Sequence, residues 1–138
     1  MIKTIDMQDL RYLNLFGKIT KVSTKYCFQY NEAIVFCLPK HLISKALGEN
    51  GKNIRQISEM LKKRIKIIPI PRGIEDVKLF IGAIINPVTF KELEIKGDEI
   101  ILTAGSQNKA ALIGRNKRRL LEMQKIIKSF FGKDFKII

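Results

Sequence analysis

Tryptophan is absent from the 138-residue sequence, histidine occurs once, and there are two cysteines. Two cysteines, Cys27 and Cys37, are too few for the disulfide framework of a small secreted domain, and they indicate a reducing cytoplasm. With His41 they give three potential metal ligands at irregular spacing, one fewer than a structural zinc site requires. The sequence therefore predicts a cytoplasmic protein without a bound metal or cofactor, in which both cysteines are small buried hydrophobic residues.

Acidic residues are also scarce, since 13 Asp and Glu stand against 26 Lys and Arg, for a net charge of +13. Such an excess indicates nucleic acid as the first candidate partner and an anionic membrane as the second. No run approaches the roughly 20 consecutive apolar residues of a membrane span, and residues 1–6 lack the apolar region of a signal peptide. We therefore expect a monomer that binds nucleic acid and does not enter a membrane.

Catalytic groups are the third kind of feature that is missing. Catalysis on RNA would require paired carboxylates, a pair of histidines or a metal cluster. The lone His41 and the scattered acidic residues provide none of these. A binding protein is expected rather than an enzyme.

An internal repeat organises the sequence. Gly48 and Gly114 lie 66 positions apart, and each is followed by a polar stretch and basic residues. The same offset places residues 34–38 over residues 100–104. The sequence therefore predicts two units of similar length, residues 1–70 and 71–138, joined in a segment with two prolines and a glycine. Because units this small bury only about 60% of their unfolded surface, we expect them to pack together as one rigid unit.

Each unit is predicted to have the element order α-β-β-α-α-β, an α+β fold. A longer basic helix follows each glycine loop and precedes the last strand. The other elements are expected at 9–16, 18–30, 33–38, 41–47 and 66–70 in the first unit, and at 75–85, 88–95, 99–103, 106–113 and 135–138 in the second.

The loop Gly48-Glu49-Asn50-Gly51 lies between two predicted helices and is followed by Lys52. Glycine permits positive φ and close approach of a ligand, and a helix N-terminus favours anions, so phosphate is the expected guest. A P-loop does not fit, because Ala46 stands at its first glycine and Asn53 at its hydroxyl. A helix-turn-helix normally belongs to a helical bundle. The plain alternative, that the glycines only connect two helices, is weakened by recurrence of the loop in the second unit.

These residues resemble the KH family of RNA-binding domains, in which a GXXG loop clamps the backbone of about four nucleotides. The element order is similar to the prokaryotic KH variant, and two such domains in tandem resemble the archaeal NusA-like transcription factors. The resemblance implies single-stranded RNA as a partner, RNA polymerase as a candidate partner, and a role in transcription termination or antitermination. The alternatives are a KH protein of ribosome assembly or RNA processing and a structural ribosomal protein.

The resemblance is carried over residue by residue. The first loop matches completely, whereas Lys117 stands in the second loop where the last glycine belongs. A lysine there either obstructs the backbone clamp or contacts phosphate itself. Leu47, Ile54 and Ile57 are candidates for the apolar groove that holds bases, although an ordinary place in the core is favoured for each of them. We expect aspartates at Gly48 and Gly51 to repel phosphate without unfolding the chain. The predicted RNA-binding residues are Gly48, Glu49, Asn50, Gly51, Lys52, Arg55, Gly114, Arg115, Asn116, Lys117, Arg118 and Arg119.

Overall fold

The computed structural model describes residues 7–138. Residues 1–6, on which the expected lack of a signal peptide rests, lie outside the described part. The described chain forms two compact units, one that runs to Ile70 and one from Pro71 to Ile138, called here the first and the second unit. Each is a mixed α+β structure with one three-stranded sheet.

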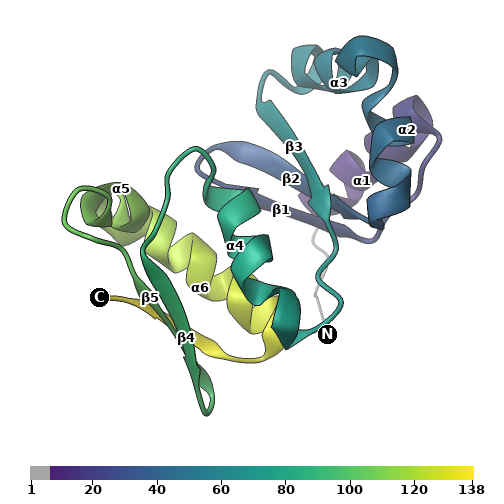
Figure 1. Ribbon diagram of the computed structural model, residues 1–138. Helices are drawn as coiled ribbons and strands as arrows, with labels where there is room; N and C mark the ends of the chain where they lie inside the picture. Colours follow the sequence, from purple (N-terminus) through teal and green to yellow (C-terminus); the bar gives the residue numbers. More distant parts are fainter. Residues whose placement is uncertain (1–6) are drawn as a thin grey trace. The chain divides into compact units, whose positions relative to one another are not determined.

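From Met7 to Ile70 the first unit contains three α-helices and one sheet, which Figure 1 draws. Its elements are α1 (Met7–Thr20), β1 (Tyr26–Tyr30), β2 (Ala33–Leu38), α2 (Ile43–Leu47), α3 (Lys52–Leu61) and β3 (Arg64–Pro69). The central strand β2 pairs antiparallel with β1 and parallel with β3. All six residues of the central strand β2 are buried, and its sequence is correspondingly a continuous apolar run.

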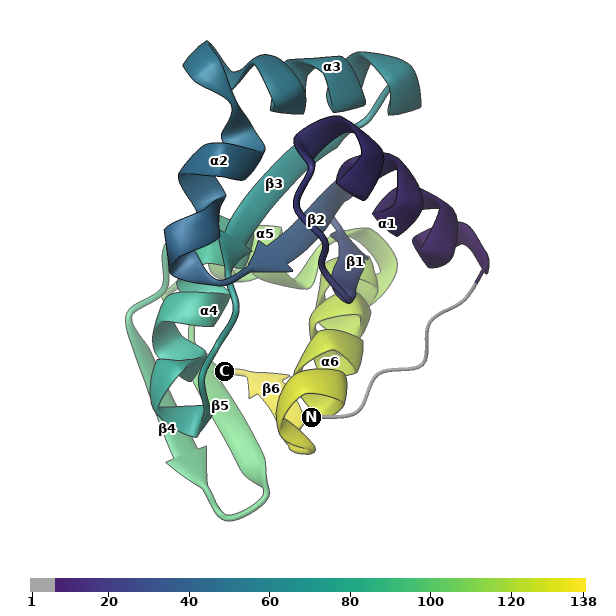
Figure 2. The ribbon, with the colours of Figure 1, turned by 90° about the vertical axis from the view of Figure 1, so that its right-hand side faces the viewer.

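The helices of the first unit cover the face of the sheet that carries Ile34, Phe36 and Leu38 (Figure 2). Phe16 of α1 stacks on Phe36 with ring centroids 4.2 Å apart. Ile57 of α3 is fully buried in the same cluster. This core fixes where α3 begins, and thereby where the first glycine loop lies.

The second unit repeats this arrangement. Its elements are α4 (Val77–Ile85), β4 (Glu92–Lys96), β5 (Glu99–Thr103), α5 (Lys109–Ile113), α6 (Arg118–Phe131) and β6 (Asp134–Ile137). The strand order is β4-β5-β6, antiparallel and then parallel. Helices α4 and α6 lie side by side in Figure 1, with the rings of Phe80 and Phe130 4.9 Å apart. The predicted order α-β-β-α-α-β is present in both units.

The largest errors in the predicted bounds are at two strand starts, and smaller ones occur elsewhere, as at α5, which begins at Lys109 and not at 106. Residues 18–20 continue α1 instead of starting a strand, because Thr20 is buried and its hydroxyl donates to the carbonyl of Phe16 at 2.7 Å. Strand β4 begins at Glu92, not at Val88, because the Val88 amide donates back to the Ile85 carbonyl in a turn. Such local hydrogen bonds replace strand pairing and are not visible in the hydrophobic pattern.

At the start of the second unit, Arg72 is hydrogen-bonded to Asp76, the residue immediately before α4. The backbone amide and Nε of Arg72 both donate to Oδ2 of Asp76, at 2.9 and 3.0 Å. These hydrogen bonds lower the pKa of Asp76 from its ordinary value. The carboxylate therefore fixes the conformation of the chain immediately before the helix.

Residues 7–138 show neither a membrane span nor a metal cluster. None of the described helices combines the length and apolar character that crossing a bilayer requires. The same residues contain no cluster of three or more histidine, cysteine or acidic side chains suited to a metal ion. Cys27 and Cys37 are both buried, as predicted.

Candidate nucleic-acid interface

The two glycine loops have the same backbone conformation. Gly48 and Gly114 both have φ 78°, with ψ of 171° and 169°. Asn50 and Asn116 are both left-handed, at φ 56°. The position after the asparagine is also left-handed in both loops, at Gly51 with φ 71° and Lys117 with φ 61°. Lys117 therefore adopts the glycine conformation, although its side chain makes that costly.

Close packing beneath each loop explains the first glycine. A Cβ atom on Gly48 would lie 2.9 Å from Cγ of Asn53, and one on Gly114 would lie 2.9 Å from Cγ of Arg119. Asn53 and Arg119 occupy the same place relative to the two loops. The torsion angles of both glycines belong to a region that only glycine enters readily.

Each loop leads directly into an amphipathic helix that no side chain caps. Gly51 precedes α3 and Lys117 precedes α6, and neither helix start receives a side-chain hydrogen bond. The first amides of an uncapped helix carry partial positive charge toward solvent. Lys52 and Arg118, the first residues of the two helices, are both exposed beside them. Each loop thus presents amides and a cation together, which suits phosphate.

Two predicted phosphate ligands have structural contacts instead of pointing freely to solvent. The guanidinium of Arg55 donates to the carbonyl of Asn50 inside the first loop. Arg119 is half-buried and donates from Nη1 to the carbonyl of Ala111 at 2.8 Å. Arg55 thus braces its own loop, whereas Arg119 links α6 to α5. Residue type alone could not reveal this, because the accepting carbonyls belong to the backbone.

An open groove of about 440 Å³ runs between α3 and β3 in the first unit. Ile54 and Ile65 supply its apolar surface, and Arg55, Arg64 and Lys66 supply positive charge. Ile54, for which a place in the core was favoured, is therefore open to a ligand in this groove. Ile57 is not, because it is fully buried in the core.

Sequence reasoning did not single out Lys66 or Arg64, which belong to the final strand of the first unit. Burial, followed by repulsion from Arg64, lowers the pKa of Lys66 below 10.5. Alternation along an edge strand is the signal that could have found them, since Arg64 and Lys66 are two residues apart and share a face.

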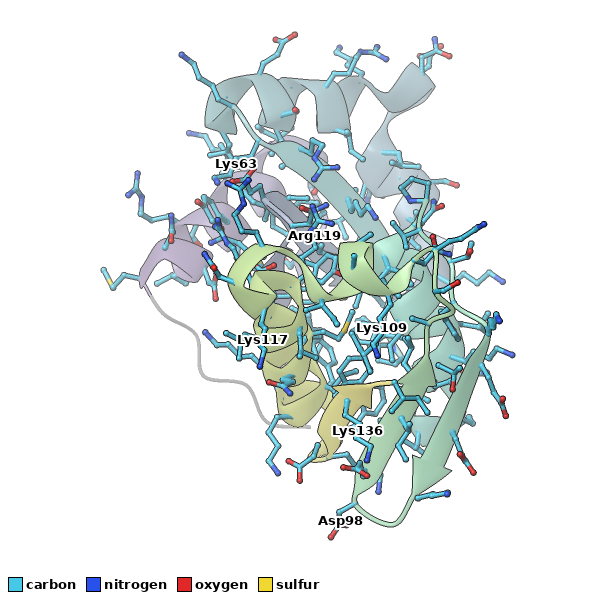
Figure 3. The ribbon with its side chains drawn as sticks, turned by 90° about the vertical axis from the view of Figure 1, so that its left-hand side faces the viewer. Lys63, Asp98, Lys109, Lys117, Arg119 and Lys136 are labelled. Atoms are coloured by element: carbon cyan, nitrogen blue, oxygen red, sulfur yellow. The ribbon has the colours of Figure 1, made fainter. Side chains whose placement is uncertain are left out.

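The second loop is more basic than the first. Arg115, Asn116 and Arg118 line one groove of about 540 Å³ on the outer side of α6. Figure 3 shows Lys117 and Arg119 at the loop end of α6, away from Asp98 at the tip of the β4–β5 hairpin. Arg119 does not line that groove, because it is directed to Ala111.

Replacing Lys117 with glycine is expected to stabilise the chain by about 0.5–1 kcal/mol, because glycine adopts positive φ without strain. The melting temperature should rise by about 2 °C. RNA binding through the second loop should tighten, since amides are then closer to phosphate, while the salt dependence of binding falls slightly. Gly51→Lys is the reciprocal variant and should destabilise. A clear loss of RNA affinity in Lys117→Gly would show that Lys117 is itself a phosphate ligand.

No family profile matches the chain. Over 100 residues it is 26% identical to a probable transcription termination protein NusA from Methanococcus vannielii, an alignment that covers 71% of this chain. The chain spans 56% of the length of that relative. A protein of the same name from Halococcus morrhuae is 24% identical over 130 residues, which cover 88% of this chain and 91% of that protein.

The fold is shared with a solved structure. The crystal structure of APE1850 superposes with a TM-score of 0.67 at 19% identity, and the alignment covers 97% of this chain and 99% of that one. The similarity extends over both units. The chain is thus a two-unit α+β protein with distant similarity to archaeal NusA-like proteins.

Proposed function

We propose that the chain is a single-stranded RNA-binding protein composed of two tandem KH domains, residues 1–70 and 71–138. The observation that carries this proposal is the pair of loops with equal backbone torsions. Each places uncapped helix amides beside cationic side chains. The second loop repeats the backbone conformation of the first although a lysine stands there in place of the glycine, and this recurrence supports a shared role for the two loops.

The groove beside the first loop supports single-stranded RNA rather than duplex. It places apolar Ile54 and Ile65 next to cationic Arg64 and Lys66, so bases and phosphates find separate partners. In an A-form duplex the base faces are stacked and cannot contact such a surface. Single-stranded RNA displays both.

The names of the distant relatives support a role in transcription. We propose that the chain acts as a cytoplasmic, monomeric NusA-like termination, antitermination or elongation factor with RNA polymerase as a second partner. In this role it binds RNA without catalysing a reaction. The alternative function is ribosome assembly or RNA processing, and the experiment described next distinguishes the two.

The test combines binding with fractionation. A fluorescent single-stranded RNA should bind the purified chain more tightly than a duplex of the same length. A tagged chain should co-purify with RNA polymerase from its native cells and leave ribosomal subunits at high salt. Failure to bind single-stranded RNA would contradict RNA binding. Retention on ribosomal subunits at high salt would contradict the role in transcription.

Lys66 predicts a pH dependence of RNA binding. Because its pKa is lowered in the folded chain, its charge weakens folding at neutral pH, and this penalty fades as pH rises through the lowered pKa. RNA affinity should fall over the same window, below pH 10.5, because the cation is lost. The other charged groups of the groove are Arg55, Arg64 and Glu59.

Lys66→Arg is the matched variant for this prediction, because arginine keeps its charge throughout the window. Affinities of wild type and variant should be compared by fluorescence anisotropy between about pH 7 and pH 10. Any loss of affinity that arises from other lysines is common to both proteins, so it cancels in the ratio of the wild-type affinity to the variant affinity. A ratio that does not change with pH would remove Lys66 from the RNA-binding surface.

A further inference from the structure

The outer face of α6 carries a groove of unusual composition. Four residues of α6 line the groove and lie on one face of the helix, because they stand at positions i, i+3, i+4 and i+7. They are Arg118, Leu121, Glu122 and Lys125. Arg115 of the second loop lines the groove as well. Three cations therefore stand against one acidic residue.

Leu121 is the exceptional residue of this groove. Its side chain is 57% exposed, and it occupies the position that Arg55 holds in the first unit. A single exposed leucine is ordinary on a protein surface. Leu121 is not isolated in this way. It stands where the first unit has an arginine, and it places an exposed apolar side chain beside the cationic side chains of the groove.

The two units also differ between the helix and the last strand. In the second unit Nε2 of Gln124 donates to the carbonyl of Phe135 at 3.1 Å and so bridges α6 and β6. The corresponding residue of the first unit, Ser58, donates to Lys63 at 2.7 Å, ahead of β3. The groove between the helix and the last strand is therefore open in the first unit. In the second unit the side chain of Gln124 crosses the corresponding space from α6 to β6.

We propose that the second unit seats one nucleotide of single-stranded RNA on this outer groove, with the base against Leu121 and the flanking phosphates on Arg115 and Lys125. The proposal rests on the proposed RNA-binding function and adds a base-contact residue to it. The excess of cations selects RNA over an apolar protein helix as the occupant, because phosphate matches the charge and a base covers the leucine. The strand then follows α6 on its outer side, away from the Gln124 bridge.

Leu121→Ala is the direct test. RNA affinity should be measured in the full chain that also carries Asn50→Asp. That substitution weakens RNA binding by the first loop, so the second unit contributes most of the remaining affinity. Affinity for a fluorescent single-stranded RNA should fall about three- to tenfold, because apolar area no longer covers the base. The slope of log affinity against log salt should stay unchanged. Arg115→Gln should instead lower that slope by about 0.7, the value for one phosphate contact.

Leu79→Ala is the matched control, because Leu79 lies on α4 of the same unit and is even more exposed, at 76%. It should leave affinity unchanged, and both variants should melt as their parent does. Equal affinity of Leu121→Ala and the parent, or equal losses in both leucine variants, would overturn the proposal. So would a change in self-association or polymerase binding with RNA binding unaltered. Absence of RNA binding in the unmodified chain would contradict the proposed function itself.

Discussion

Replacing Gly48 with aspartate should destabilise the first unit by about 2–4 kcal/mol. The torsion angles of Gly48 alone cost a non-glycine residue about 1–3 kcal/mol. The new Cβ would also lie 2.9 Å from Cγ of Asn53 and 3.2 Å from its backbone nitrogen, and the backbone atom cannot move aside independently. Chemical denaturation monitored by circular dichroism should show a lower transition midpoint for this variant.

Gly97→Asp provides the matched control for this loss. Gly97 also has positive φ, in the β4–β5 turn, but no atom lies within 4 Å of the place that its Cβ would take. It should lose less stability, because aspartate tolerates the left-handed region and meets no neighbour there. Equal losses in the two variants would show that close packing against Asn53 is not what requires Gly48.

Replacing Asn50 and Asn116 together with aspartate should lower affinity for single-stranded RNA at least about tenfold at moderate salt. The change is isosteric, and both residues are left-handed, a conformation that aspartate accepts as asparagine does. Each carboxylate removes a donor and repels phosphate at a site where charge-assisted hydrogen bonds contribute about 1.5–3 kcal/mol each. Fluorescence anisotropy measures the affinity, and the melting temperature should be unchanged.

The control must carry the same change in net charge. Asn14→Asp with Asn86→Asp meets this condition, since Asn14 lies on α1 and Asn86 directly follows α4, and neither lines the two grooves. This pair should weaken binding only slightly, through the general field of the protein. If both pairs lower affinity equally, charge alone governs binding and the glycine loops have no special role.

Much of the fold was predictable because the repeat and the hydrophobic periodicity are strong. The bounds of β2 and β5 agree with the expected 33–38 and 99–103. The offset of 66 does not extend to the final strands, where Arg64 and Asp134 take the same register position 70 residues apart. The four additional residues correspond to about one turn of helix, so α6 is longer than α3 without disturbing either sheet.

The candidate site was only partly predictable. Sequence reasoning identified the loops, but it could not show that Lys117 adopts the glycine conformation, because torsion angles depend on the surrounding packing. It also expected aspartates at Gly48 and Gly51 to weaken RNA binding and leave the fold intact, and the contact with Asn53 revises the second part of this expectation. The hydrogen bonds of Arg55 and Arg119 to backbone carbonyls arise only after folding. Charge composition indicates phosphate binding, whereas it does not assign the individual ligands.

The central claim is that RNA lies on the two glycine loops, and crosslinking tests it most directly. The full chain should be photocrosslinked to single-stranded RNA, digested, and analysed by mass spectrometry. Crosslinked peptides are expected from residues 48–66 and 114–125, which contain the loops and both grooves. Crosslinks confined to other surfaces, such as the β4–β5 hairpin around Asp98, would contradict this claim.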